Sequence, residues 1–116
     1  GELLPEDLAR EVQEETGLKV LTMGRLVYIM QCHDRSSDSQ TLAFVFEVDQ
    51  WRGDLRVDDP DNLILKTDFL SVDEATKKLQ TLPWRYMRDP LIAYLHNEMP
   101  LGSVWIYRDE EVVAKF

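Results

Sequence analysis

Apolar positions recur with a helical period at the start of the chain. Leu4, Leu8 and Val12 are spaced by four residues, and the residue types at either end of this stretch fit a helix boundary. Proline is favoured in a first helical turn, and a glycine such as Gly17 is favoured just after the last turn. The pattern predicts a helix over residues 5–16.

Segments rich in β-branched and aromatic residues predict strands further along. Residues 25–32 (RLVYIMQC) and 41–48 (TLAFVFEV) are separated by the polar stretch HDRSSDSQ, so we expect an antiparallel pair. A loop rich in aspartate with Gly and Pro follows over residues 51–62. Further strands are expected over residues 63–70, 104–107 and 111–116.

Two more helices are expected between these strands. Ser71 precedes VDEATKKL, and Glu74 stands at its third helical position, as in a capping box. A second helix is expected over residues 87–97, where apolar residues gather on one side. The order of helices and strands predicts an α/β fold in which helices pack on the faces of a mixed sheet.

Size and charge limit the classes of function. A chain of 116 residues and 13.6 kDa suits one domain over residues 1–116. Its formal charge of -9 disfavours a nucleic-acid polymer or an anionic membrane as partner, whereas a small phosphate ester stays open because carboxylates recruit divalent cations. Cys32 is the only cysteine and no apolar run reaches membrane-spanning length, so a cytoplasmic location fits best.

Three carboxylates cluster on the expected N-terminal helix. At about 100° per residue, Glu11, Glu14 and Glu15 lie within one turn of one another at the margin of the apolar stripe. Like charges repel there unless a cation joins them, and Mg²⁺ or Mn²⁺ prefers such oxygen ligands. Arg10 can brace Glu14 at spacing four. The alternative is a solvated acidic face that favours the helix dipole.

The order of these residues resembles the signature of the Nudix hydrolase family. That signature reads G, five residues, E, seven residues, then R-E-U-x-E-E-x-G-U with U aliphatic. Here Glu2 is followed by LLPEDLA and then by REVQEETGL, which matches every fixed position from Glu2 to Leu18. The leading glycine would lie before the first residue, so we expect a chain that is incomplete at its N-terminus and lacks the preceding strand.

The resemblance implies an α/β/α sandwich and hydrolysis of a nucleoside diphosphate linked to another moiety, with Mg²⁺ or Mn²⁺ as cofactor. Glu11, Glu14 and Glu15 would be metal ligands, with Glu11 also a candidate base, and Arg10 would orient the acids. Glu2 is an outer candidate. ADP-ribose-like compounds and nucleoside triphosphates are the leading substrate classes, and a homodimer stays open as the form of assembly.

Other residues offer weaker candidates. Members of this family often recruit one further acid, and four acids on a later strand or loop could supply it: Glu47, Asp58, Asp59 and Asp61. Each is more often a turn former or a solvated charge. In LPWRYMRDP, two aromatic and two basic side chains could contact a base and phosphate, although packing and capping of the next helix is preferred: Trp84, Arg85, Tyr86 and Arg88.

A function of a different class competes with the enzyme. A Nudix-fold module could bind or sense a nucleotide with little or no turnover. The three acids of the signature argue for the enzyme, because nucleotide binding alone does not require all of them.

Overall fold

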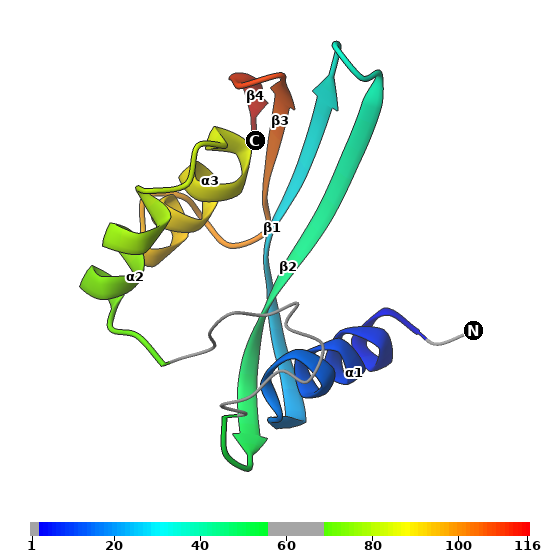
Figure 1. The fold of residues 1–116 in the computed structure, drawn as a ribbon, viewed down its shortest axis with the longest axis vertical. Coiled ribbons are helices and arrows are strands. Elements are labelled where there is room, and N and C mark those ends of the chain that lie inside the picture. The colour runs from blue at the N-terminus through cyan, green and yellow to red at the C-terminus, as the bar shows by residue number, and fades with distance from the viewer. Residues whose placement is uncertain (1–2, 56–68) are drawn as a thin grey trace. The chain divides into compact units, whose positions relative to one another are not determined.

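The computed structural model describes residues 3–55 and 69–116, and it forms three helices and four strands there. Their order along the chain is α1 (Leu4–Thr16), β1 (Lys19–Asp34), β2 (Ser39–Arg52), α2 (Val72–Leu79), α3 (Arg85–Leu95), β3 (Ser103–Arg108) and β4 (Glu111–Lys115) (Figure 1). The chain divides into two compact units. Unit 1 comprises Gly1–Gly24 and Glu47–Phe69, and unit 2 comprises Arg25–Phe46 and Leu70–Phe116.

The strands form one mixed sheet in the order β2-β1-β3-β4. β1 and β2 run in opposite directions (Figure 1), β1 pairs with β3 in parallel from Tyr28↔Ser103 to His33↔Arg108, and β3 pairs with β4 antiparallel. The parallel step between β1 and β3 requires a crossover, and α2 and α3 supply it. The expected mixed sheet with helices and the expected antiparallel pair are confirmed.

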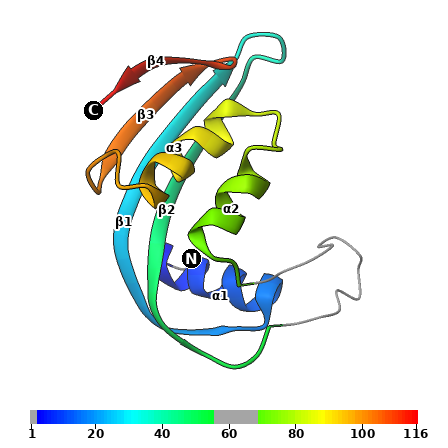
Figure 2. The same ribbon diagram turned by 90° about the vertical axis from the view of Figure 1, so that its left-hand side faces the viewer.

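The hydrophobic core lies in unit 2, between α3 and the sheet. Tyr28, Met30 and Cys32 of β1 point to one face of the strand, because successive side chains of a strand point to opposite sides, and the neighbouring Val27 is buried on the other face. Ala93 of α3 closes the cluster, and α2 packs on α3 (Figure 2). The buried members are Val27, Tyr28, Met30, Cys32, Ala93, Trp105 and Tyr107.

Local signals in the sequence set several boundaries as expected. Gly17 ends α1 with a φ of 82°, which favours glycine, and its N–H donates to the Gln13 carbonyl at 2.9 Å. At the start of α2, the Glu74 N–H donates to Ser71 Oγ at 3.2 Å, and the Ser71 N–H donates back to the Glu74 carboxylate at 3.3 Å. The capping box is therefore confirmed.

Other boundaries differ from the sequence-based expectation. α3 begins and ends two residues earlier than residues 87–97. Its end precedes Asn97, which has a φ of 56° and cannot continue a helix. β1 and β2 extend well beyond residues 25–32 and 41–48. The strand expected over residues 63–70 falls outside the described residues except for Phe69 and Leu70, which are not in a strand.

Gly24 lies inside β1, where an end of the strand was expected. A Cβ placed there would come within 2.9 Å of both the Asp49 carboxyl carbon and the Glu47 carbonyl oxygen. The close approach of β2 thus requires a glycine at this position of the strand. None of the described helices is long and apolar enough to cross a membrane.

Candidate active site on α1

The three acids of the signature lie on exposed positions of α1, in unit 1. Glu11, Glu14 and Glu15 are exposed, while Leu8 and Val12 beside them are half-buried. This places the carboxylates next to the apolar side of the helix, as the spacing predicted. Because the three side chains are exposed, a substrate and hydrated ions have access to them.

The last turn of α1 is fixed by polar contacts of its own. Thr16 Oγ1 donates to the Val12 carbonyl at 2.6 Å and accepts from the Leu18 N–H at 3.1 Å. Leu18 follows the helix and is buried. A substituted Cβ at Gly53 would lie 3.5 Å from the Gly17 carbonyl, so the chain after β2 runs close to the end of the helix. These contacts hold in place the backbone that carries Glu14 and Glu15.

Arg10 contacts two acids of the same helix. Its guanidinium donates to Glu14 Oε1 at 3.0 Å, which is the bracing that spacing four predicted. It also pairs with Asp7, a residue to which the sequence reasoning gave no role. Because one guanidinium contacts both carboxylates, Arg10 restricts the rotamers open to Glu14.

Carboxylate oxygens are the ligands that Mg²⁺ and Mn²⁺ prefer, so the donor chemistry of the three glutamates fits the divalent cations that Nudix enzymes generally use. Among the described residues, however, no three His, Cys, Asp or Glu side chains are arranged to hold a metal ion. Glu14 has one oxygen committed to Arg10. Ion binding therefore requires the glutamate side chains to change rotamer.

The candidates for a further acid divide into two groups. Glu47 lies on β2 in unit 1 and is half-buried. Asp58, Asp59 and Asp61 lie outside the described residues, as does Glu2. Which of the four candidates supplies the further acid stays a prediction: Glu47, Asp58, Asp59 or Asp61.

One feature of unit 1 had no sequence signal. The rings of Trp51 and Phe69 stack with centroids 6.0 Å apart, although the two residues are far apart along the chain. Trp51 is 46% exposed. The pair arises from tertiary contact, which no local pattern encodes.

In unit 2, the residues of LPWRYMRDP open α3. The Arg88 guanidinium donates to the Leu82 carbonyl at 2.7 Å, and the Arg85 N–H donates to Glu110 Oε2 at 2.7 Å. The interpretation of this stretch as a packing and capping segment is thus supported for Arg88. Tyr86 packs edge-on against Tyr107, with ring centroids 6.4 Å apart.

Comparison with known families identifies the family of the chain. The family profile described as the NUDIX domain matches residues 1–93, which is most of the chain and includes the whole of α1. The chain belongs to the NUDIX family. It is a Nudix-type hydrolase of the pyrophosphohydrolase kind.

The fold agrees with that assignment. The crystal structure of the Mutator MutT protein from Bacillus halodurans is similar over 100% of this chain and 74% of that one, with 24% sequence identity and a TM-score of 0.66. At this identity the similarity concerns the Nudix fold. A search of curated proteins gives no match.

Proposed function

We propose that this Nudix domain is a metal-dependent pyrophosphohydrolase that cleaves a nucleoside diphosphate linked to another moiety by attack of water at phosphorus. The observation that carries the proposal is the exposed group of Glu11, Glu14 and Glu15 on α1, within the signature that ends at Leu18. ADP-ribose-like compounds and nucleoside triphosphates are the two substrate classes to test first.

The roles of the side chains follow from their chemistry. Mg²⁺ or Mn²⁺, when bound by the three glutamates, would neutralise diphosphate oxygens and make a bound water more acidic. The Glu11 carboxylate has no hydrogen-bond partner among the described residues, so it suits the role of proton acceptor. Arg10 holds Glu14 in position before the ion arrives and can release it for coordination.

A hydrolysis assay on the purified protein tests the proposal. A panel of ADP-ribose, other nucleotide sugars and nucleoside triphosphates is incubated with Mg²⁺, with Mn²⁺ and with a chelator. We expect hydrolysis of at least one compound that requires the ion, and a loss of at least about 10²-fold in kcat for Glu14→Gln. Glu6→Gln is the matched control, because Glu6 is an exposed acid of the same helix outside the acidic group.

The competing function is a nucleotide-binding or regulatory module. Binding a nucleotide would not require the three glutamates to converge, and Glu14 is paired with Arg10 in the structure. Calorimetry separates the two functions. Tight nucleotide binding with no product, unchanged by Glu14→Gln, would favour the module and overturn the proposed reaction.

A further inference from the structure

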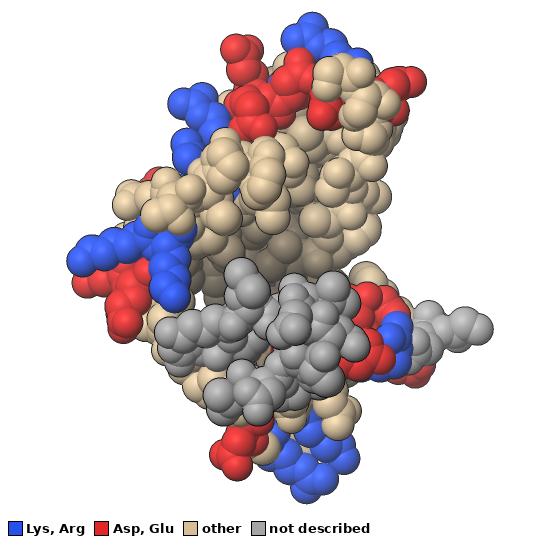
Figure 3. Space-filling model, viewed as in Figure 1, with Lys and Arg blue, Asp and Glu red and all other residues tan. Residues whose placement is uncertain are grey.

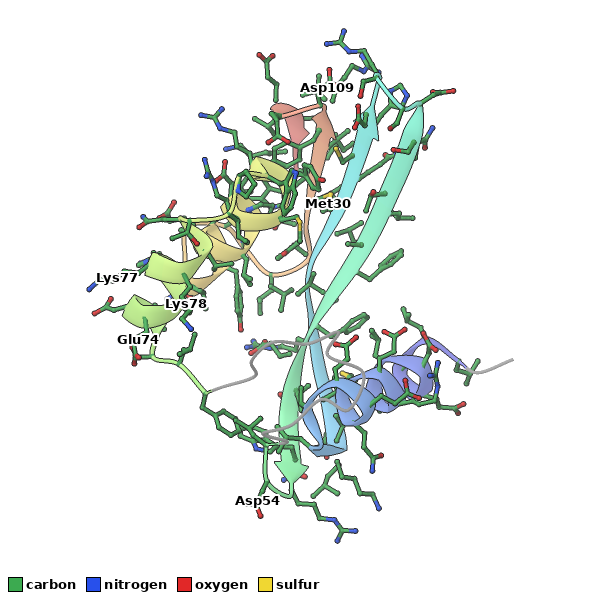
Figure 4. All side chains as sticks on the ribbon, in the orientation of Figure 1. Met30, Asp54, Glu74, Lys77, Lys78 and Asp109 are labelled. Atoms are coloured by element: carbon green, nitrogen blue, oxygen red, sulfur yellow. The ribbon has the colours of Figure 1, made fainter. Side chains whose placement is uncertain are left out.

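A cavity of about 500 Å³ lies in unit 2, beyond the carboxyl ends of β1 and β3. Its volume is in the range of small-molecule pockets. Figure 4 labels Asp109 in the turn between β3 and β4, and Figure 3 shows both acidic and basic side chains at this end of unit 2. Residues from three chain segments line it, namely Asp34, Arg35, Trp84, Tyr86, Asp109 and Glu110.

The charges in this cavity do not balance. Arg35 binds Asp109 through its Nε at 2.8 Å and its backbone N–H at 2.9 Å, so this pair is neutral. Asp34 and Glu110 then leave two negative charges. Hydrogen bonds from Ser36 lower the pKa of Asp34, so this carboxylate stays ionised at neutral pH. A phosphate or carboxylate ligand would be repelled here.

One carboxylate oxygen of Glu110 is available to accept a hydrogen bond from a ligand. Its Oε2 accepts from the Arg85 N–H at 2.7 Å, and its Oε1 has no hydrogen-bond partner in the part of the chain that the structure describes. The contact with Arg85 anchors the side chain at the first residue of α3. Oε1 is therefore held in position, and none of the described residues donates a hydrogen bond to it.

Two aromatic side chains, Trp84 and Tyr86, also line the cavity. The Trp84 side chain is 46% exposed although it lines a cavity, and the Tyr86 ring is held by its contact with Tyr107. The face of an indole or phenol ring attracts cations and covers apolar groups. A ligand that packs on the aromatic rings and pairs with the carboxylates would carry a positive charge on an apolar body.

We propose that this cavity binds a small organic cation, an ammonium group or a positively charged heterocycle attached to a planar apolar body, which contacts Trp84 and Tyr86 and is attracted by Asp34 and Glu110. The site lies within unit 2 and is independent of the hydrolysis assigned to α1. It makes no use of phosphate groups or of a metal ion.

The test compares two probes that differ only in charge. 2-Phenylethylamine is an ammonium ion at pH 7, and 2-phenylethanol has nearly the same shape without the charge. Titrations of the full chain by NMR or calorimetry are expected to show the amine binding at least about tenfold more tightly, with affinity falling as salt is added. Equal affinity of the two probes, or no binding of the amine at millimolar concentration, would overturn the proposal.

Paired variants locate the binding. Trp84→Leu and Glu110→Gln should each weaken binding of the amine about five- to tenfold. Glutamine can still accept from the Arg85 N–H, so the start of α3 is retained. Trp51→Leu replaces a tryptophan that is also 46% exposed, and Glu111→Gln removes the neighbouring exposed charge on β4. If these controls weaken binding as much, the amine is attracted by the general acidity of the protein and the assignment is refuted.

Discussion

At the scale of single residues, Arg10 is the side chain whose role is best defined by contacts. It pairs with Glu14 and with Asp7 on an exposed helix face. Exposed ion pairs of this kind contribute about 0–1 kcal/mol to stability, so the value of the contact lies in orienting an acid. An arginine that orients a carboxylate affects turnover more than folding.

Arg10→Ala is accordingly expected to lower kcat about 10- to 100-fold while changing the free energy of unfolding by less than about 1 kcal/mol. Steady-state kinetics and urea unfolding measure the two effects. Arg10→Lys should restore only part of kcat, because a lysine cannot contact two acids through one planar group. Arg52→Ala, an exposed arginine of β2, is the control. A loss of stability that parallels the loss of kcat would contradict the orienting role.

The pH dependence of stability has a source at Asp109. Hydrogen bonds from the Arg35 backbone N–H and side chain lower the pKa of Asp109 below its usual value of 3.8. Its stabilising contribution is therefore present above pH 3.8 and is lost as the pH falls through the lowered pKa. Asp109→Asn should make the free energy of unfolding less dependent on pH below about 4. An NMR titration of the Asp109 carboxyl with a midpoint at or above 3.8 would refute this expectation.

At the scale of secondary-structure elements, the pairing of β1 with β2 depends on the small residue at position 24. The Asp49 carboxyl group and the Glu47 carbonyl oxygen occupy the space around it. An added side chain must displace one of them, and the Glu47 oxygen belongs to the backbone. The strand therefore tolerates only glycine without rearrangement.

Gly24→Ala is expected to reduce the free energy of unfolding by about 1–3 kcal/mol, as overpacking does elsewhere. The double variant with Asp49→Ala should recover part of this loss, since the carboxyl group is removed and the Glu47 carbonyl remains. Asp49→Ala alone, at an exposed position, should cost no more than about 0.5 kcal/mol. Urea unfolding of the four proteins gives the coupling. Strict additivity would show that the carboxyl group does not restrict position 24.

The elements also show which parts of the fold the sequence determines locally. The end of α1 at Gly17 and the capping box at Ser71 depend on residues a few positions apart, and both were predictable. The start of α3 involves a bond from Arg85 to Glu110, 25 residues away, and its predicted position was wrong by two residues. The full length of β1 likewise requires its partners in the sheet.

The same division applies to the candidate sites. The acids of α1 and the Arg10–Glu14 pair follow from helical spacing within one segment, so the sequence sufficed to find them. The cavity of unit 2 joins Asp34 to Asp109 across the sheet, and the parallel pairing of β1 and β3 creates that proximity. A pattern read along one segment has no means to reveal it.

At the scale of the whole molecule, the two units differ in how much they bury. Unit 2 contains the buried cluster, whereas Leu18 is the only buried residue among those described in unit 1. Hydrogen exchange is slowest where burial is greatest. Amides of β3 should therefore exchange more slowly than amides of α1, as measured by NMR or mass spectrometry. Equal protection of both elements would contradict this ordering.

The weak burial of α1 makes it a sensitive reporter of ion binding. A divalent cation held by Glu11, Glu14 and Glu15 would join successive turns of the helix and slow the exchange of its amides, because a ligand that binds only the ordered state stabilises it. Addition of Mg²⁺ should then protect residues 8–17 and leave β3 unchanged. The effect should be absent in Glu14→Gln and retained in Glu6→Gln. Protection that survives Glu14→Gln would show that the ion binds elsewhere, whatever the hydrolytic activity proves to be.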